Sequence, residues 1–194
     1  MISLLLDSSN KNLSVGIGKN GKVLAFSEYE AWQQQSELMI PEIAKLVNDN
    51  NITFEQINNI VVAIGPGSYT GVRIAVTIAK IMAFILKAKL YTVSSLAVLA
   101  SATKPTICLV NARSNRSYFA VYEKDAMLIK DTILSNEEIL AFIKANPEYL
   151  LSGDLNYLGI TPITIDRFQN MLNLINKENE VSDLMSVKPQ YLKD

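Results

Sequence analysis

Three strands followed by a helix are predicted twice along this chain, and this repeat constrains the fold more than any other feature. In the first half, the predicted strands and helix cover residues 2–6, 13–18, 22–29 and 36–50. In the second half, they cover residues 106–110, 117–123, 127–134 and about 136–145. The run Leu4–Asp7 stands in register with Cys108–Asn111. The repeat predicts an α/β fold of two lobes, 1–103 and 104–194, each with a mixed sheet and helices.

The connections between these elements agree with the repeat. Asn20-Gly21 between two apolar runs predicts a hairpin, and Lys124-Asp125 predicts a second tight turn. Pro41 removes a helical hydrogen bond, so the first helix is expected to start near Leu38 or to bend there. Ser135 or Asn136 can cap the helix of the second half. The remaining predicted elements are strands over 60–64, 90–93 and 149–152 and helices over 72–86 and 95–102.

Composition narrows the functional classes. The hydrophobic fraction of 49% and the charged fraction of 19% are those of a globular protein. A net charge of −1 offers no basic footprint for holding nucleic acid directly. The single cysteine, Cys108, excludes a disulfide framework and is expected to lie in the core, and the N-terminus does not resemble a signal peptide, so we expect a cytoplasmic protein. The chain has no histidine, which removes the commonest general base and metal ligand.

A glycine-rich turn lies between the predicted strand 60–64 and the predicted helix 72–86. It reads Gly-Pro-Gly-Ser-Tyr-Thr-Gly over residues 65–71. Such a turn lets the backbone approach another group closely, and its hydroxyls stand at a helix N-terminus where N–H groups are free. Asp7 and the turn residues Gly65, Gly67, Ser68, Thr70 and Gly71 are therefore candidates either for a phosphate site or for shaping the start of the helix.

Known nucleotide and hydrolase motifs do not match this turn. It lacks the Gly-Lys-Ser/Thr ending of a P-loop and the spacing of a dinucleotide site. A serine hydrolase would need a different glycine spacing and a histidine. No metal site and no cofactor are predicted, and no catalytic residue is assigned.

The ends of the two equivalent strands carry Asp7 and Asn111. A carboxylate at each end would hold a metal-bound phosphate, but an amide is neither a base nor a strong ligand, so the acidic pair is broken. We expect an Asx-type turn at Asp7–Asn10. A small ATPase or kinase that binds a magnesium nucleotide through Asp7 and the 65–71 turn remains the alternative function, and a metallopeptidase is a third.

The predicted helix 72–86 is apolar around most of its circumference. Its polar residues Arg73, Thr77 and Lys80 form one narrow stripe. The remaining apolar surface of the helix is wider than one sheet can cover. The helix is judged too short and too interrupted to span a membrane. Because the helix 36–50 has a second wide apolar face, a protein–protein interface is predicted. Its residues are Leu38, Met39, Ile43, Leu46, Val72, Arg73, Val76 and Lys80.

Several segments resemble the TsaB (YeaZ) family of bacterial tRNA threonylcarbamoyladenosine biosynthesis proteins. Residues 65–74 resemble its Gly-Pro-Gly-Ser-Phe-Thr-Gly-Leu-Arg-Ile/Val signature. Residues 35–41 are similar to its His-Ser-Glu-x-Leu-x-Pro segment, and 111–122 to its Asp-Ala-Arg…Glu-Val-Tyr hairpin. Residues 2–15 resemble its opening strand and turn, and 189–193 its terminal Pro-x-Tyr-Leu-Arg.

The resemblance implies an actin-like ATPase fold of two ribonuclease-H-like lobes, without catalytic activity of its own. It also implies that the chain binds and activates the catalytic paralogue TsaD, that a TsaE-type ATPase joins the complex, and that tRNA is contacted only through the complex. Without that partner, a homodimer formed through the same broad apolar surface is the alternative that stays open.

Three features depart from the family pattern. Gln35 replaces the usual histidine, Asn111 replaces the usual aspartate, and the C-terminal lobe is short, with the missing part expected between about 153 and 186. Both substitutions weaken the case for an active site.

Overall fold

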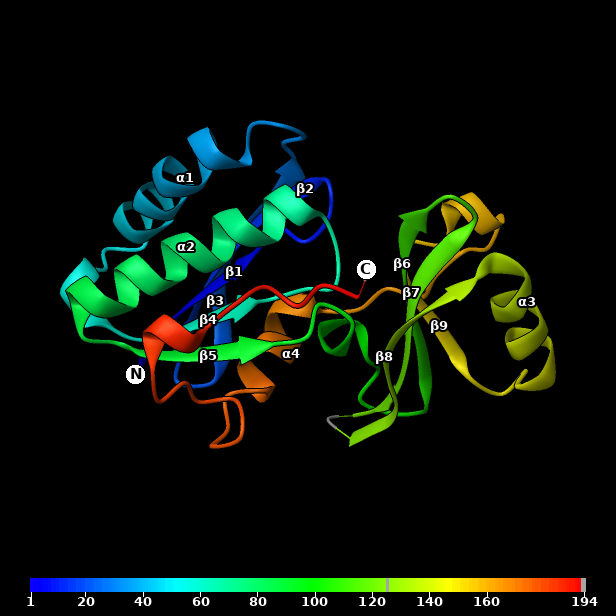
Figure 1. The fold of residues 1–194 in the computed structure, drawn as a ribbon. Helices are drawn as coiled ribbons and strands as arrows, with labels where there is room; N and C mark the ends of the chain where they lie inside the picture. The colour runs from blue at the N-terminus through cyan, green and yellow to red at the C-terminus, as the bar shows by residue number, and fades with distance from the viewer. Residues whose placement is uncertain (125, 193–194) are drawn as a thin grey trace.

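The computed structural model describes residues 1–124 and 126–192 as two α/β lobes side by side (Figure 1). Each lobe is built on its own mixed sheet. Two predictions fall partly outside the described residues. The tight turn at Lys124-Asp125 includes Asp125, and the C-terminal motif ends at Lys193.

The first sheet has five strands in the order β3-β2-β1-β4-β5. They are β1 (Ile2–Asp7), β2 (Asn12–Lys19), β3 (Lys22–Glu30), β4 (Ile57–Ala63) and β5 (Lys89–Val93). β1 to β3 form an antiparallel meander, and β4 and β5 run parallel to β1. The hairpin between β2 and β3 turns at Asn20 and Gly21, which both have positive φ, so the predicted hairpin is confirmed.

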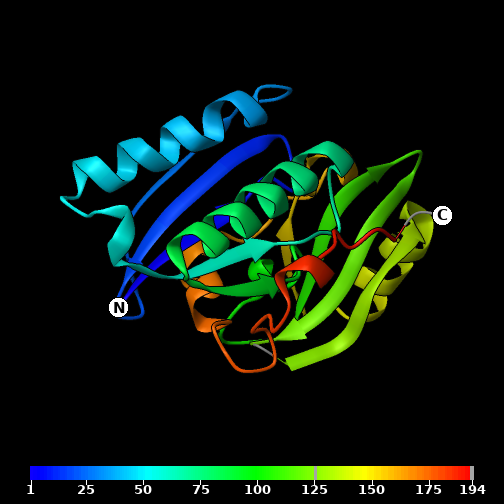
Figure 2. The same ribbon diagram turned by 60° about the vertical axis from the view of Figure 1, so that its left-hand side comes forward.

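Helices cover both faces of this sheet. α1 (Gln35–Asp49) and α2 (Tyr69–Leu86) pack on one face, where Leu4, Leu6 and Val62 join the core, and α4 (Arg167–Asn173) packs on the other, against Leu5 and Val61 (Figures 1 and 2). Side chains alternate across a strand, so the apolar runs Leu4–Leu6 of β1 and Ile60–Ala63 of β4 serve two cores. A one-turn 3₁₀ helix, η1 (Phe54–Gln56), precedes β4.

α1 contains Pro41 in its interior and begins before it, at Gln35. The prediction of a start near Leu38 is therefore wrong. Pro41 lies on the exposed side of the helix, where water can bond to the Glu37 carbonyl that the missing N–H leaves free. α2 also begins earlier than predicted, because Ser68 caps it by accepting a hydrogen bond from the Gly71 N–H at 3.2 Å.

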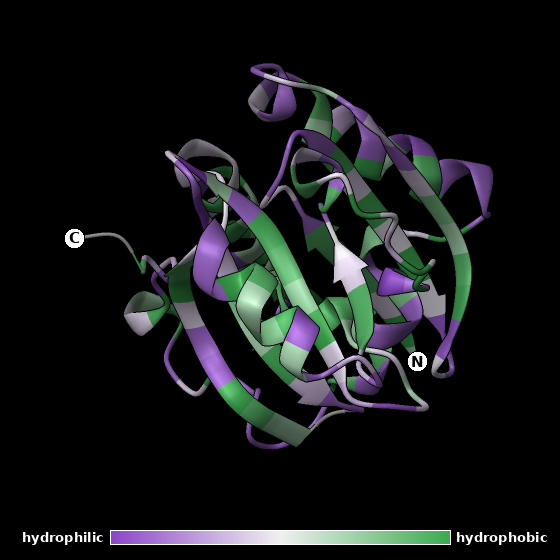
Figure 3. Cartoon of the chain, turned by 90° about the vertical axis from the view of Figure 1, so that its right-hand side faces the viewer, coloured by the Kyte–Doolittle hydropathy of each residue, from purple (hydrophilic) through white to green (hydrophobic). Residues whose placement is uncertain are grey.

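The second sheet repeats the first four strands in the order β8-β7-β6-β9. Its elements are β6 (Thr106–Arg113), β7 (Arg116–Glu123), β8 (Ala126–Ser135), α3 (Asn136–Ala145) and β9 (Leu150–Gly153). The predicted repeat of three strands and a helix is thus confirmed. Figure 3 shows both hydrophobic and hydrophilic stretches along these strands. Their outer apolar face packs on Ile139 of α3, and Ser135 caps that helix as predicted.

The inner face of the second sheet packs against the first lobe through Cys108, Ala120 and Tyr122. Cys108 is buried, as expected, and burial raises the pKa of its thiol. The helix predicted over 95–102 is wrong: this segment holds one 3₁₀ turn, η2 (Ala97–Leu99), and leaves it extended at Ala100. The Asn170 amide of α4 donates to the carbonyls of Val98 and Ala100, which removes acceptors that a longer helix would use.

After β9 the chain passes a 3₁₀ turn, η3 (Asn156–Leu158), and returns to the first lobe. α4 and the segment that comes after it pack there, and η4 (Leu184–Ser186) is the last helical turn. The Val181 N–H donates to the Leu90 carbonyl at 2.8 Å, and the Gln190 N–H donates to the Ile64 carbonyl at 2.7 Å. The lobe boundary at 103/104 stays a prediction, and the segment 167–192 lies on the first lobe.

Candidate functional site

The glycines of the 65–71 turn make room for other parts of the same chain. A Cβ atom on Gly71 would lie 1.9 Å from the carbonyl oxygen of Ser8, and one on Gly67 would lie 2.2 Å from that of Ser9. Ser8 and Ser9 belong to the turn after β1. The close approach that the sequence indicated is therefore the contact between this turn and the start of α2.

Gly65 makes room for the C-terminal segment. Its φ is +107°, which favours glycine, and a Cβ atom there would lie 2.6 Å from the Gln190 carbonyl oxygen. The Gly65 N–H donates to the Ser95 hydroxyl at 3.1 Å, and the Ser95 N–H donates back to the Gly65 carbonyl at 2.8 Å. The turn is thus held between Ser95, which follows β5, and the C-terminal segment.

The polar groups at the start of α2 are largely used within the chain. The Ser68 N–H donates to the Ser9 carbonyl at 2.6 Å, and the Gly71 N–H is taken by the Ser68 side chain. The Ser8 hydroxyl donates to the Gly71 carbonyl at 2.7 Å, whereas Thr70 is exposed. These internal bonds account for the shape of the turn, and a phosphate site there stays a prediction.

Asp7 and Asn111 form the same turn at equivalent places in the two lobes. An Asp7 carboxylate oxygen accepts the Ser9 N–H at 2.8 Å, and the Asn111 amide oxygen accepts the Arg113 N–H at 2.8 Å. The expected Asx turn at Asp7 is confirmed. Because the same bond forms with either side chain, the turn does not require the negative charge of Asp7.

Arg167 supplies a cation to Asp7 and was not found from the sequence. Its guanidinium Nη1 lies 3.7 Å from the Asp7 carboxylate, and its Nη2 donates to Glu28 at 2.6 Å and to the Ser14 hydroxyl at 2.8 Å. Asp166 caps α4 just before it. A capping residue before Phe168, Met171 and Leu172 at helical spacing was the signal that could have indicated this helix.

A cleft of about 730 Å³ lies between the two lobes. Arg167 and the 67–70 stretch of the glycine turn line it, but Asp7 does not. The Arg113 guanidinium stacks on Trp32 across the cleft, 5.6 Å from the ring centroid, and burial raises the pKa of Asp154. Within residues 1–124 and 126–192, no three acidic or cysteine side chains gather into a group that could hold a metal ion.

The predicted interface residues divide into an inner and an outer set. Met39, Ile43, Leu46, Val72 and Val76 are buried in the core beneath α1 and α2. The prediction that these five residues face a partner is therefore wrong. They form the apolar stripe that packs on the sheet, and none of them lies on the outer surface. Leu38 and Lys80 are half-buried, and Arg73 is exposed. The assignment of a partner to these helices remains a prediction.

The outer face of α1 and α2 carries different apolar side chains. They are Ile40 on α1 and Ile81, Phe84 and Ile85 on α2, and we call them the outer face. Phe84 is 76% exposed and Ile85 is 68% exposed. Ile81, Phe84 and Ile85 share one side of α2 because they are three and four residues apart, and exposed apolar patches mark binding sites. The sequence indicated the excess apolar surface of α2 but could not tell which residues form it.

α2 is also long and apolar enough, by length and composition alone, to cross a membrane. The prediction that it is too short is wrong, because capping at Ser68 lengthens it to 18 residues. Its inner side packs on β4 and α1. The core helix of a soluble protein packs in this way and passes the same test.

Comparisons with known proteins converge on one group. Residues 29–150 match the family model described as TsaD, tRNA N6-adenosine threonylcarbamoyltransferase. The tRNA threonylcarbamoyladenosine biosynthesis protein TsaB of Bacillus subtilis is 28% identical over 100% of this chain and 94% of its own length. An uncharacterised protein of Mycoplasma genitalium is 26% identical over 98% of this chain and 94% of its own length. YeaZ from Pseudomonas aeruginosa superposes with a TM-score of 0.80 at 21% identity, covering 98% of this chain and 99% of that one. This likeness confirms the fold class.

Proposed function

Because the chain belongs to the family of the tRNA N6-adenosine threonylcarbamoyltransferase TsaD, and within it to the TsaB (YeaZ) proteins, we propose that it serves threonylcarbamoyladenosine formation in tRNA as a non-catalytic subunit. It binds and activates a TsaD-like catalytic paralogue in the cytoplasm. A TsaE-type ATPase joins the assembled complex, and tRNA is contacted only through that complex. The relatives that carry the TsaB name support the pathway.

The observation that carries the binding role is the exposed outer face of α1 and α2. Phe84 and Ile85 leave most of their apolar surface in water, and neither is among the residues that form or flank the cores of the described part of the chain. Covering such side chains with a partner is favourable by about 25 cal/mol per Å² of apolar area. A second helical surface of the same kind would meet this requirement.

The charges around Asp7 support a non-catalytic role. A base or metal ligand needs a free carboxylate, whereas Asp7 is buried beside the Arg167 guanidinium and accepts a backbone N–H. Asn111, at the equivalent place, is neutral. These contacts speak against the alternative of a magnesium-nucleotide enzyme built on Asp7 and the glycine turn.

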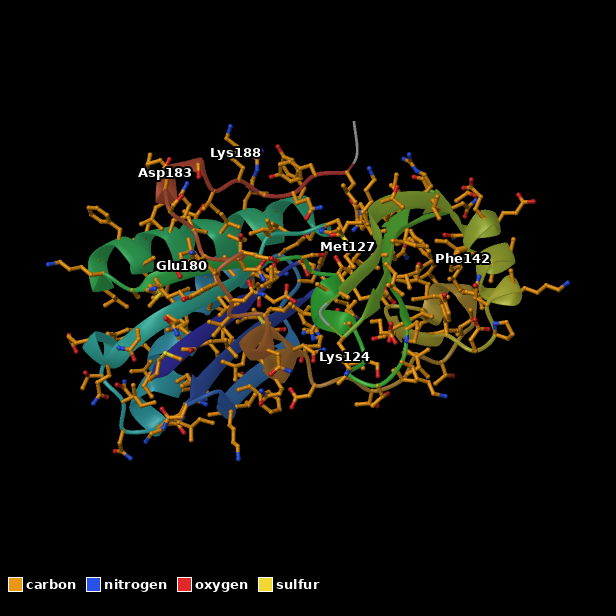
Figure 4. All side chains as sticks on the ribbon, turned by 90° about the horizontal axis from the view of Figure 1, so that it is seen from below. Lys124, Met127, Phe142, Glu180, Asp183 and Lys188 are labelled. Carbon is orange, nitrogen blue, oxygen red and sulfur yellow. The ribbon has the colours of Figure 1, made fainter. Side chains whose placement is uncertain are left out.

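A binding measurement tests the proposal. Purified chain is titrated with the purified TsaD-like paralogue from the same organism, and the Phe84→Asp variant is compared with wild type. Placing a charge at a central contact should weaken the affinity by about 30-fold or more. Met127→Asp is the matched control, because Met127 is 58% exposed on β8 of the other lobe (labelled in Figure 4) and should bind as wild type does.

Two results would contradict the proposal. One is unchanged affinity of Phe84→Asp for the paralogue. The other is modification activity of the isolated wild-type chain on tRNA that Asp7→Asn abolishes while the variant keeps its melting temperature.

A further inference from the structure

The C-terminal segment runs along α2 on the side opposite α1 (Figures 1 and 2). We call residues 183–192 the strap. Near the middle of α2, the Lys80 ammonium donates to the Val187 carbonyl at 3.2 Å. At the start of α2, the Arg73 guanidinium donates to the Tyr191 hydroxyl at 2.6 Å. α2 therefore lies between two neighbours, α1 and the strap.

The strap is held in place along its length. Leu184 and Val187 pack against the core cluster beneath α2. The Asp183 carboxylate accepts the Met185 N–H at 2.9 Å, and the Gln190 N–H donates to Ile64 in the space that Gly65 leaves. A segment fixed in this way presents its outward side chains without a further ordering cost on binding.

The outward side chains of the strap are of the types that bind proteins. Met185 is 80% exposed, the most of any large apolar side chain in the described residues. The rings of Tyr191 and Tyr69 stack with centroids 4.8 Å apart, and the Arg73 guanidinium lies 4.0 Å from the Tyr69 centroid. Methionine, tyrosine and arginine are enriched at protein interfaces, and tyrosine and arginine dominate binding energies.

The charged residues of α2 are positive, and the strap carries Lys188 as well as one acidic residue at its start, Asp183. α2 contains Arg73 and Lys80 and no acidic residue, and Lys188 projects from the strap near α2 (Figure 4). No carboxylate within residues 1–124 and 126–192 forms an ion pair with Arg73. The complementary surface is therefore apolar opposite Met185 and carries a carboxylate opposite Arg73.

We propose that the strap is the third element of the docking surface, next to α1 and α2, and that the TsaD-like catalytic paralogue covers it. An apolar side chain of the paralogue contacts Met185, and a carboxylate contacts Arg73 within the aromatic stack. This inference rests on the proposed function, which assigns the outer face to the TsaD-like paralogue. The strap lies next to that face, so the same partner would cover both. It adds residues that a two-helix interface would leave uncovered.

The test is a titration of the full chain and its variants with the purified paralogue. Met185→Asp and Tyr191→Ala should each weaken the affinity by about tenfold or more. Tyr191→Phe keeps the ring stack and should weaken it less. Arg73→Gln should lose affinity mainly at low salt, because its contact is ionic. Phe84→Asp reports on the outer face, and Met127→Asp is the control.

The outcomes separate the two proposals. If Phe84→Asp weakens binding and neither strap variant does, the strap inference is overturned and the proposed function stands. If none of these variants weakens binding, the proposed function fails as well. Strap variants that change only self-association, measured by sedimentation, assign the strap to a second copy and also overturn the inference. Should Tyr191→Ala not fold, Met185→Asp decides, because that side chain is almost fully in water.

Discussion

The two lobes share the order of their first four strands and differ beyond the fourth strand. In the first lobe, β4 leads through the glycine turn into the 18-residue helix α2 and then into β5. In the second lobe, β9 leads into a connection that returns to the first lobe as α4. The second lobe therefore has no counterpart of α2 or β5 within the described residues. Ile81, Phe84 and Ile85 of the outer face belong to α2, which has no counterpart in the described part of the second lobe, and this locates the proposed docking surface on the first lobe.

The lobes also treat equivalent polar positions differently. Asp7 and Asn111 make the same backbone bond, but only Asp7 carries a charge that must be balanced in a buried place. The balancing cation, Arg167, comes from the segment that leaves the second lobe. The ion pair between Arg167 and Asp7 therefore links the segment that follows the second sheet to the first lobe.

Removing that cation should have the largest effect. Arg167→Ala leaves Asp7 buried without a counter-ion and should lower the free energy of unfolding by about 3 kcal/mol. Adding Asp7→Asn makes the first lobe like the second and should restore part of the loss. Chemical denaturation of the wild type and of the single and double variants measures both values. A double variant no more stable than Arg167→Ala would show that the charge of Asp7 is not the cause.

The glycine turn that only the first lobe has should be the next most sensitive place. Gly71→Ala puts a methyl group against the Ser8 backbone and should cost about 2–3 kcal/mol by overpacking. Gly159→Ala in the second lobe meets nothing within 4 Å and has only its positive φ of 68° to strain it, so it should cost about 1 kcal/mol. Thermal unfolding compares the two. Equal losses would contradict the packing explanation of the turn.

The cap of α3 tests a feature that α1 lacks. The Ser135 side chain and the Glu138 carboxylate form a capping box, whereas Gln34 at the start of α1 makes no side-chain cap. Ser135→Ala should lower stability by about 1 kcal/mol. The hydrogen bonds from Ser135 lower the pKa of Glu138, so this stabilisation is present above the unfolded-state pKa and is lost as pH falls through the folded one.

The difference between wild type and Ser135→Ala should therefore shrink as acid protonates Glu138. Denaturation midpoints measured at neutral pH and at acidic pH check this. A difference that grows in acid would contradict the capping box.

The smallest effect is expected at Asn111. Asn111→Asp restores the acidic pair of the two lobes, and a carboxylate can accept the same N–H bond from Arg113. Since Asn111 is only half-buried, stability should change by less than about 1 kcal/mol. Calorimetry should detect no Mg-ATP binding to this variant, because Arg167 still occupies Asp7. Binding of Mg-ATP at micromolar concentration would revive the enzyme alternative.

Much of the fold could be predicted from local patterns. The repeated strands, the Asn20-Gly21 hairpin and the Ser135 cap depend on neighbours in the sequence, and all three are confirmed. The helix predicted over 95–102 does not form, because the Asn170 amide donates to the Val98 and Ala100 carbonyls, which a longer helix would use for its own hydrogen bonds. α4 was missed because it is short, and its apolar residues pair with strands far away in the sequence.

The sequence by itself determined the repeated strands, the glycine turn and an α2 with more apolar surface than a sheet can cover. Only the tertiary structure decided which side of α2 faces outward, what occupies the space beside each glycine, and which cation balances Asp7. The reason is physical: periodicity and turn chemistry act between near neighbours. The contacts of Gly71 with Ser8, Arg73 with Tyr191 and Arg167 with Asp7 join residues that only folding brings together.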